Sequence, residues 1–75
     1  MPRRRRPESS RQRIARHILA LRNAHGFTQA MLGERAGLHR TYIGAVERAE
    51  VNISADNIDR IARALAVDPS ALLAP

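Results

Sequence analysis

The sequence contains no cysteine, no lysine and no tryptophan, and only one phenylalanine and one tyrosine. Without cysteine it has neither disulfides nor thiolate metal ligands, and its histidines, His17, His25 and His39, lack the partners that a zinc site needs. With so few aromatic rings it also lacks a stacking platform for single-stranded nucleic acid. A domain of 75 residues buries only about 60% of the surface that its unfolded chain exposes. The core must therefore be built from Leu, Ile, Val and Ala.

No stretch approaches the roughly 20 apolar residues that span a bilayer, and the N-terminal arginines are not followed by the apolar segment of a secretory signal. We therefore expect a soluble, cytoplasmic protein with no membrane partner. The sequence also has no nucleophile beside a base, no credible carboxylate pair and no phosphate-binding glycine loop. It predicts no enzyme activity, no cofactor, no metal and no small-molecule ligand.

All thirteen cationic side chains are arginines, and against seven acidic side chains they give a net charge of +6. Four of these arginines form one run: Arg3, Arg4, Arg5 and Arg6. Without this run nine arginines face seven acids, so most of the excess charge belongs to the N-terminus. Residues 1–8 are charged and have almost nothing to bury, which predicts a disordered basic arm. This composition fits a DNA-contacting arm, like those of homeodomains, and equally an anionic membrane surface or a solvated tail.

Residues 9–75 are predicted to form one helical domain. Ser9 or Ser10 can cap a first helix in which Ile14 and Ile18 recur at helical spacing and which ends before Gly26. Four more helix starts share one device, in which two apolar residues five positions apart flank a candidate N-cap residue. The four caps are Thr28, His39, Ser54 and Asp68. Because no segment alternates like a strand, we predict a compact all-α bundle of five short helices.

The segment from residue 28 to residue 47 predicts a helix-turn-helix. Its first helix ends at Ala36, Gly37 supplies the turn, and its second helix starts near His39. Small helical bundles often contain such corners, so the corner alone does not indicate DNA binding. The faces of the second helix carry the further signal.

At 100° per residue, Ile43 and Val46 share one face of this second helix. The opposite face carries Arg40, Thr41, Gly44 and Ala45. Small residues on an exposed face let a helix approach closely, and a DNA major groove about 12 Å wide admits a helix. Arginine can donate two hydrogen bonds to guanine, and threonine can contact a base or the thymine methyl group. Arg40 and Thr41 are therefore the predicted base readers, and the alternative is an ordinary solvated face.

Further residues of a known pattern accompany this helix: Thr28-Gln29, Leu32, Ala36-Gly37, Arg40-Thr41-Tyr42-Ile43, Val46-Glu47-Arg48, Asn52, Asp56-Asn57-Ile58 and Ile61-Ala62-Arg63-Ala64-Leu65. With them the chain resembles the Cro and phage-repressor (Xre) helix-turn-helix family over roughly residues 10 to 73. The string from Leu38 to Gly44, with Glu47 and Arg48, is most similar to the controller proteins of restriction–modification systems. The resemblance implies a five-helix, lambda-repressor-like DNA-binding domain.

The resemblance also implies roles for individual residues. The resemblance implies that Gln29 contacts a phosphate and sometimes a base. It places Arg40, Thr41 and Ala45 at base-reading positions. Positions near phosphates are implied for Thr28, His39, Tyr42, Arg48 and Asn52. Arg22 and Glu47 match a pair that forms an internal salt bridge. Three positions depart from the family pattern: His39 replaces the usual cap residue, Gly33 replaces alanine, and Ala49 replaces glycine and is strained if its φ is positive.

Taken together, these features predict a homodimeric transcriptional regulator that binds palindromic double-stranded DNA, with half-sites about 10 bp apart. The C-terminal part offers more apolar surface than a terminal helical turn needs, and a two-fold partner can bury the excess. The predicted dimer interface consists of Leu65, Val67, Leu72 and Leu73.

Three alternatives remain open at this stage. The sequence also fits the antitoxin of a toxin–antitoxin pair or the N-terminal domain of a longer regulator. It also fits a protein-interaction adaptor that keeps the fold without reading DNA, in which case Arg40→Ala leaves function intact. A membrane-active cationic peptide accounts for the arm but not for five successive helices.

Overall fold

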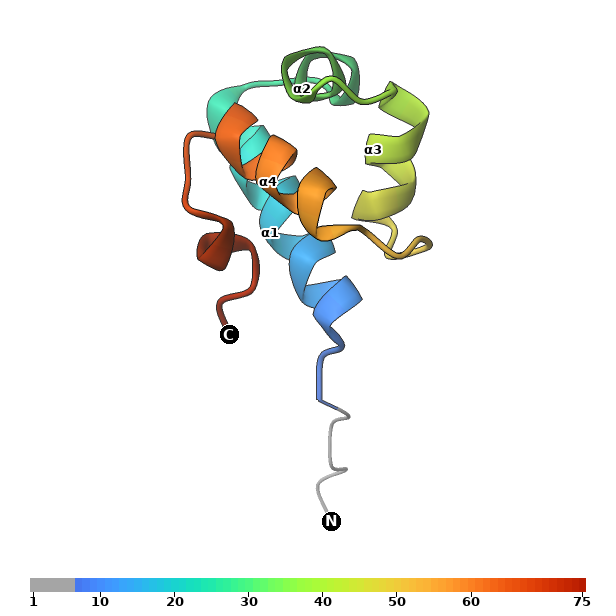
Figure 1. Cartoon of the computed structure of the whole chain (residues 1–75), viewed down its shortest axis with the longest axis vertical. Helices are drawn as coiled ribbons and strands as arrows, with labels where there is room; N and C mark the ends of the chain where they lie inside the picture. The colour runs from blue at the N-terminus through green and yellow to red at the C-terminus, as the bar shows by residue number, and fades with distance from the viewer. Residues whose placement is uncertain (1–6) are drawn as a thin grey trace.

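The computed structural model describes residues 7–75, and this part of the chain contains helices and connecting turns but no strand. The elements are α1 (Ser10–His25), α2 (Gln29–Ala36), α3 (Arg40–Glu47), α4 (Ala55–Ala64) and the 3-10 turn η1 (Pro69–Leu72). In Figure 1, α2 lies at the top, where it is seen nearly end-on, and α3 runs down the right side. None of the described helices is long and apolar enough to cross a membrane.

Each helix begins at a predicted cap, and of the two serines predicted for the first helix, Ser9 is the cap of α1. Ser9 accepts a hydrogen bond from the Gln12 amide, and the Gln12 side chain accepts one from the Ser9 amide, which completes a capping box. The side chains of the four other predicted caps each accept a hydrogen bond from a backbone amide of the first turn. His39 does so through Nδ1, which lies 3.0 Å from the Thr41 nitrogen.

The fifth helix is a correction to the prediction. The segment Pro69–Leu72 is a single 3-10 turn of four residues, so the described chain has four α-helices. Its backbone hydrogen bonds run from Ala71 to Asp68 and from Leu73 to Ser70. A segment this short closes only i to i+3 bonds, which is the usual form of such terminal turns.

All four α-helices end in the same hydrogen-bonded motif. One residue at the end of each helix adopts a left-handed conformation: the C-cap itself in α1 and α2, and the residue after the C-cap in α3 and α4. Its amide and the next amide donate to carbonyls of the last turn. Glycine provides this conformation after α1 and α2, at Gly26 and Gly37. After α3 and α4 it is provided by Ala49 and Ala66, each with a φ of 58°. The strained alanine expected after the third helix is therefore present, and a second one was not anticipated.

The core is entirely aliphatic, as the composition predicted. Its largest fully buried side chains are Ile18, Leu32, Ile43, Ile61, Leu65 and Leu72. Through it α3 packs on α1 and α2, while η1 packs on α1 and α4. The prediction that Leu65 and Leu72 form a dimer interface is therefore wrong, because both side chains are needed to close the core of the monomer.

Candidate nucleic-acid interface

The corner between α2 and α3 is unusually tight. The Leu38 amide donates to the Gly33 carbonyl over 2.8 Å, and the chain passes directly over the Cα of Gly33. A Cβ at that position would lie 2.5 Å from the carbonyl oxygen of Leu38. This contact explains why glycine stands where the family pattern has alanine.

The outer face of α3 carries the two predicted base readers. Arg40 and Thr41 are exposed, and Ala45 is partly exposed, while Ile43 and Val46 are buried on the opposite face. Gly44 does not belong to the outer face, which corrects the prediction. It is buried, and a Cβ on it would lie 3.1 Å from Arg48 Nη1 and 3.3 Å from Gln29 Oε1. The missing side chain makes room for two other candidate DNA ligands.

A partly buried polar network holds α3 in place. Arg22 Nε lies 2.6 Å from Glu47 Oε2, and Arg22 Nη2 donates to Glu47 Oε1 over 3.0 Å. The Glu47 side chain is only 5% exposed and that of Arg22 only 13%. The hydrogen bond to Glu47 raises the pKa of Arg22 above its ordinary value. The two residues for which the resemblance implied an internal salt bridge thus form one.

Gln29 joins the same network. Its Nε2 donates to Glu47 Oε1 over 3.0 Å. Because Gln29 is the first residue of α2 and Glu47 the last of α3, this bond fixes a candidate DNA ligand against the C-terminal end of α3. Gln29 is therefore partly buried and oriented in the unbound chain.

The remaining candidate phosphate ligands have partners within the chain. Thr28 and His39 are exposed and use their side chains as helix caps. Tyr42 is half-buried, and its hydroxyl accepts a hydrogen bond from Asn57 Nδ2 over 3.1 Å. Arg48 Nε lies 2.6 Å from Glu50 Oε1, and Asn52 accepts a hydrogen bond from Arg11.

Sequence reasoning missed three of these partners. Glu50 lies two residues after Arg48, so the pair was visible as neighbouring opposite charges. Asn57 and Arg11 are 15 and 41 residues away from the side chains that they bind. Only the packing of α1 and α4 brings them to the interface, and no local signal in the sequence reports it.

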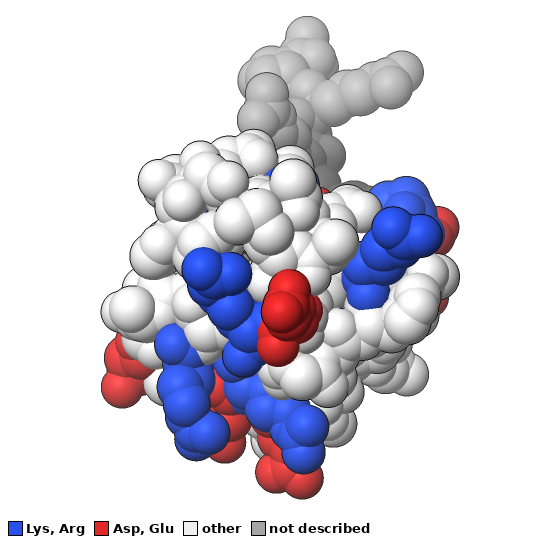
Figure 2. Space-filling model, turned by 90° about the horizontal axis from the view of Figure 1, so that it is seen from above, with Lys and Arg blue, Asp and Glu red and all other residues white. Residues whose placement is uncertain are grey.

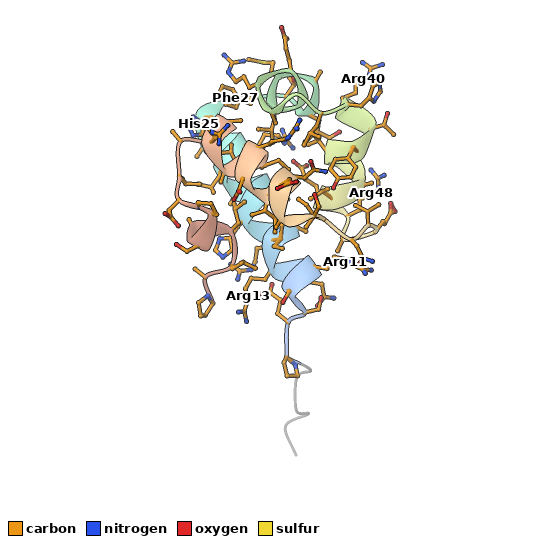
Figure 3. All side chains as sticks on the ribbon, viewed as in Figure 1. Arg11, Arg13, His25, Phe27, Arg40 and Arg48 are labelled. Carbon is orange, nitrogen blue, oxygen red and sulfur yellow. The ribbon has the colours of Figure 1, made fainter. Side chains whose placement is uncertain are left out.

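The charged side chains are not evenly spread over the described surface. Figure 2 looks down on the molecule and shows arginines on the right, the side of α3, with acidic atoms at their edge, and a separate cluster of both signs at the lower left. Figure 3 shows Arg40, Arg48 and Arg11 one below another along that same side. The predicted arm residues Arg3, Arg4, Arg5 and Arg6 lie outside the described residues. Glu8, assigned to the arm by the sequence, binds Arg16 of α1 over 2.9 Å.

Of the four predicted interface residues at the C-terminal end, two remain accessible. Leu73 is 41% exposed and Val67 is half-buried. The Leu73 carbonyl accepts a hydrogen bond from Arg13, so α1 holds the backbone of this segment while its side chain faces outward.

A family model described as helix-turn-helix, HTH_3, matches residues 18–72. The chain therefore belongs to this helix-turn-helix family. It is 42% identical over 52 residues to the control protein C.SmaI of Serratia marcescens, which covers 69% of this chain and 62% of that protein. It is 48% identical over 46 residues to the control protein C.BamHI of Bacillus amyloliquefaciens, which covers 61% of this chain and 57% of that protein. The chain thus spans about 60% of the length of these relatives.

Solved structures show the same likeness. The restriction–modification controller protein C.AhdI of Aeromonas hydrophila superimposes with a TM-score of 0.80 and 37% identity, covering 83% of this chain and 94% of that one. The hypothetical transcription factor NHTF from Neisseria gives a TM-score of 0.88 and 37% identity, covering 100% of this chain and 87% of that one. The similarity therefore extends over the whole arrangement of helices.

Proposed function

We propose that this protein is a sequence-specific regulator of transcription that binds double-stranded DNA by inserting α3 into the major groove. The observation that carries the proposal is the outer face of α3, where Arg40 and Thr41 are exposed on a helix held by the ion pair between Arg22 and Glu47. Control proteins, a controller protein and a hypothetical transcription factor among the similar proteins support it, as does the lambda-repressor-like fold that the resemblance implied.

In this proposal the side chains have separate tasks. Arg40 donates two hydrogen bonds to a guanine edge, Thr41 contacts a neighbouring base, and Ala45 allows close approach. Gln29, held by Glu47, reaches a base or the adjoining phosphate. Phosphate contacts come from Thr28, His39, Tyr42, Arg48 and Asn52. Such contacts fix the register of the protein on the duplex but carry no sequence information.

The protein is further proposed to bind as a homodimer to a palindromic operator, with the two recognition helices one turn of DNA apart. The exposed side chain of Leu73 and the half-buried Val67 support this proposal, although Leu65 and Leu72 no longer do. Sedimentation of the protein at micromolar concentration, with and without DNA, tests it. A monomer mass under both conditions would contradict it.

The names of the relatives suggest which genes are controlled. Because two of them are control proteins and the similar structure of C.AhdI is that of a restriction–modification controller protein, the proposed targets are restriction–modification genes and the gene of the regulator itself. The DNA upstream of its own gene is therefore the first duplex to test.

Competitive binding to that DNA against an unrelated duplex, across a salt series, tests the proposed function. Arg40→Ala is expected to lose roughly 1–3 kcal/mol at the specific site and little on unrelated DNA. A variant lacking residues 2–7 separates any contribution of the arginine run. Weak binding that is equal for all duplexes and disappears with that run would contradict the proposal and favour the adaptor alternative.

A further inference from the structure

An open groove lies beside α3, between the first turn of α1 and the loop that follows α3. It has a volume of about 590 Å³, and its lining includes Arg11 and Arg48 together with Ser9, Ala49 and Asn52. No carboxylate of the described residues lines it. The groove therefore combines two guanidinium groups with neutral hydrogen-bonding side chains, a composition suited to an anion.

Arg11 is the residue that this groove adds to the candidate interface. Its guanidinium donates a hydrogen bond to the Asn52 side chain, which the resemblance places near a phosphate. Arg11 also lies on the same side of the molecule as Arg40 and Arg48 (Figure 3). The line of positive charge that starts on α3 thus continues onto α1.

The neighbouring arginines of α1 differ from Arg11 in their partners. Arg13 and Arg16 both lie within ion-pair distance of Glu8, at 3.5 and 2.9 Å. Among the described residues Arg11 forms no ion pair, and the side chain that it contacts is the neutral amide of Asn52. Its charge is consequently not compensated by a carboxylate, whereas theirs is.

The present contacts in the groove are easily exchanged. Arg48 and Glu50 form an ion pair whose side chains are 59% and 52% exposed, and such surface pairs contribute only about 0–1 kcal/mol. A phosphate offers a guanidinium two parallel hydrogen bonds with opposite charge. Breaking the Arg48–Glu50 ion pair and sharing the Asn52 side chain therefore costs little free energy. The charged hydrogen bonds that a phosphate forms with guanidinium groups outweigh this cost.

We propose that this groove is the binding site for one backbone phosphate of the bound duplex, held by Arg11 together with Arg48 and Asn52. The inference rests on the proposed DNA-binding function and extends the interface from the helix-turn-helix to the first turn of α1. Arg11 positions the protein on the duplex and does not read bases.

The test compares Arg11→Gln with Arg63→Gln, a matched control. Arg63 is exposed on α4, close to the end of that helix that lies away from α3 in Figure 1. Both variants lose one positive charge, so their difference reports position and not net charge. Affinity is measured for the wild type and both variants, on the DNA upstream of the gene and on an unrelated duplex, across a salt series.

Arg11→Gln is expected to weaken binding to both duplexes by the same factor, roughly fivefold to tenfold near 0.1 M salt, and to reduce the salt slope by about one. Arg63→Gln is expected to resemble the wild type. Arg11→Lys, which keeps the charge, should retain the wild-type salt slope. Thermal unfolding of each variant verifies that it is folded, since replacing an exposed side chain usually changes stability by less than about 0.5 kcal/mol.

Failure of this inference is distinct from failure of the proposed function. If the wild type binds specifically and Arg11→Gln matches Arg63→Gln in affinity and salt slope, the proposed phosphate-binding site is wrong while the proposed function stands. If Arg11→Gln loses affinity at the specific site alone, Arg11 acts on sequence and the phosphate role is also overturned. If the wild type binds neither duplex, both proposals fail.

Discussion

Gln29, the first residue of α2, donates a 3.0 Å hydrogen bond to Glu47, the last residue of α3. The same carboxylate binds Arg22 of α1, so one buried side chain connects three helices. The orientation of Gln29, a candidate DNA ligand, and the position of α3 therefore both depend on the Glu47 carboxylate. Stability and DNA affinity are accordingly linked at Glu47, whereas they are expected to be separable at Gly44.

Glu47→Ala is expected to destabilise the protein by about 3 kcal/mol, because it leaves the largely buried charge of Arg22 without its partner. Urea unfolding measures this loss. Glu50→Ala provides the control, since it breaks the exposed pair with Arg48 and should cost less than about 1 kcal/mol. Equal losses in the two variants would show that the Glu47 pair is not a structural element of the core.

Gly44→Ala is expected to lower DNA affinity without lowering stability. Alanine is favoured over glycine inside a helix by up to about 1 kcal/mol, and the new Cβ meets only the tips of Arg48 and Gln29, at 3.1 and 3.3 Å. Those flexible tips move aside, which displaces two candidate DNA ligands. Thermal unfolding and duplex binding are measured on the same sample, and unchanged affinity would contradict the prediction.

Gly33→Ala, unlike Gly44→Ala, is expected to lower the stability of the protein. Its Cβ would lie 2.5 Å from the backbone oxygen of Leu38, and backbone in a tight turn cannot move aside as a side chain does. Overpacking of this kind costs roughly 1–3 kcal/mol. A melting temperature equal to that of the wild type would show that the turn between α2 and α3 is more adaptable than its geometry indicates.

Ala49→Gly is expected to stabilise the protein by roughly 0.5–1 kcal/mol, because alanine at a φ of 58° is strained and glycine is not. Ala66→Gly is the matched control, with the same φ of 58° after α4 and the same expected gain. The two variants differ in their distance from the interface, so only Ala49→Gly should alter DNA affinity. Loss of stability in both variants would contradict the strain argument.

Stability is expected to fall on the acid side, partly through Asp68. Hydrogen bonds from the side chain and the backbone amide of Ser70 lower the pKa of Asp68 below its ordinary value of 3.8. A lowered folded-state pKa contributes stability above that ordinary value, and the contribution is lost as pH falls through the folded-state pKa. In Asp68→Asn the decline of the melting temperature below about pH 4 should be shallower. A decline as steep as that of the wild type would contradict the prediction.

Local signals in the sequence predicted the fold well. Each cap residue acts over one helical turn, so Ser9, Thr28 and His39 identify their helix starts without knowledge of the tertiary structure. The aliphatic spacing likewise predicted the buried faces of α1 and α3. What this reasoning misjudged was how much of the C-terminal apolar surface the monomer itself covers. Leu65 and Leu72 looked like surplus because their partners on α1 and α4 become neighbours only after folding.

The candidate site was predictable only where local helical periodicity determines it. The outward position of Arg40 and Thr41 follows from helical periodicity alone. The burial of Gly44 depends on where the side chains of Gln29 and Arg48 lie, and the contact of Arg11 with Asn52 spans 41 residues. Contacts between distant segments are determined by packing, which a single sequence does not display.

Replacing single guanines of the operator by 7-deazaguanine, which lacks the N7 acceptor in the major groove, tests the central claim most directly. Affinity is measured for the wild type and for Arg40→Ala. The wild type is expected to lose roughly 1–3 kcal/mol at one guanine of each half-site, and Arg40→Ala should show no further loss there. If both proteins lose the same amount at every guanine, Arg40 does not read that edge, and α3 is not the recognition helix proposed here.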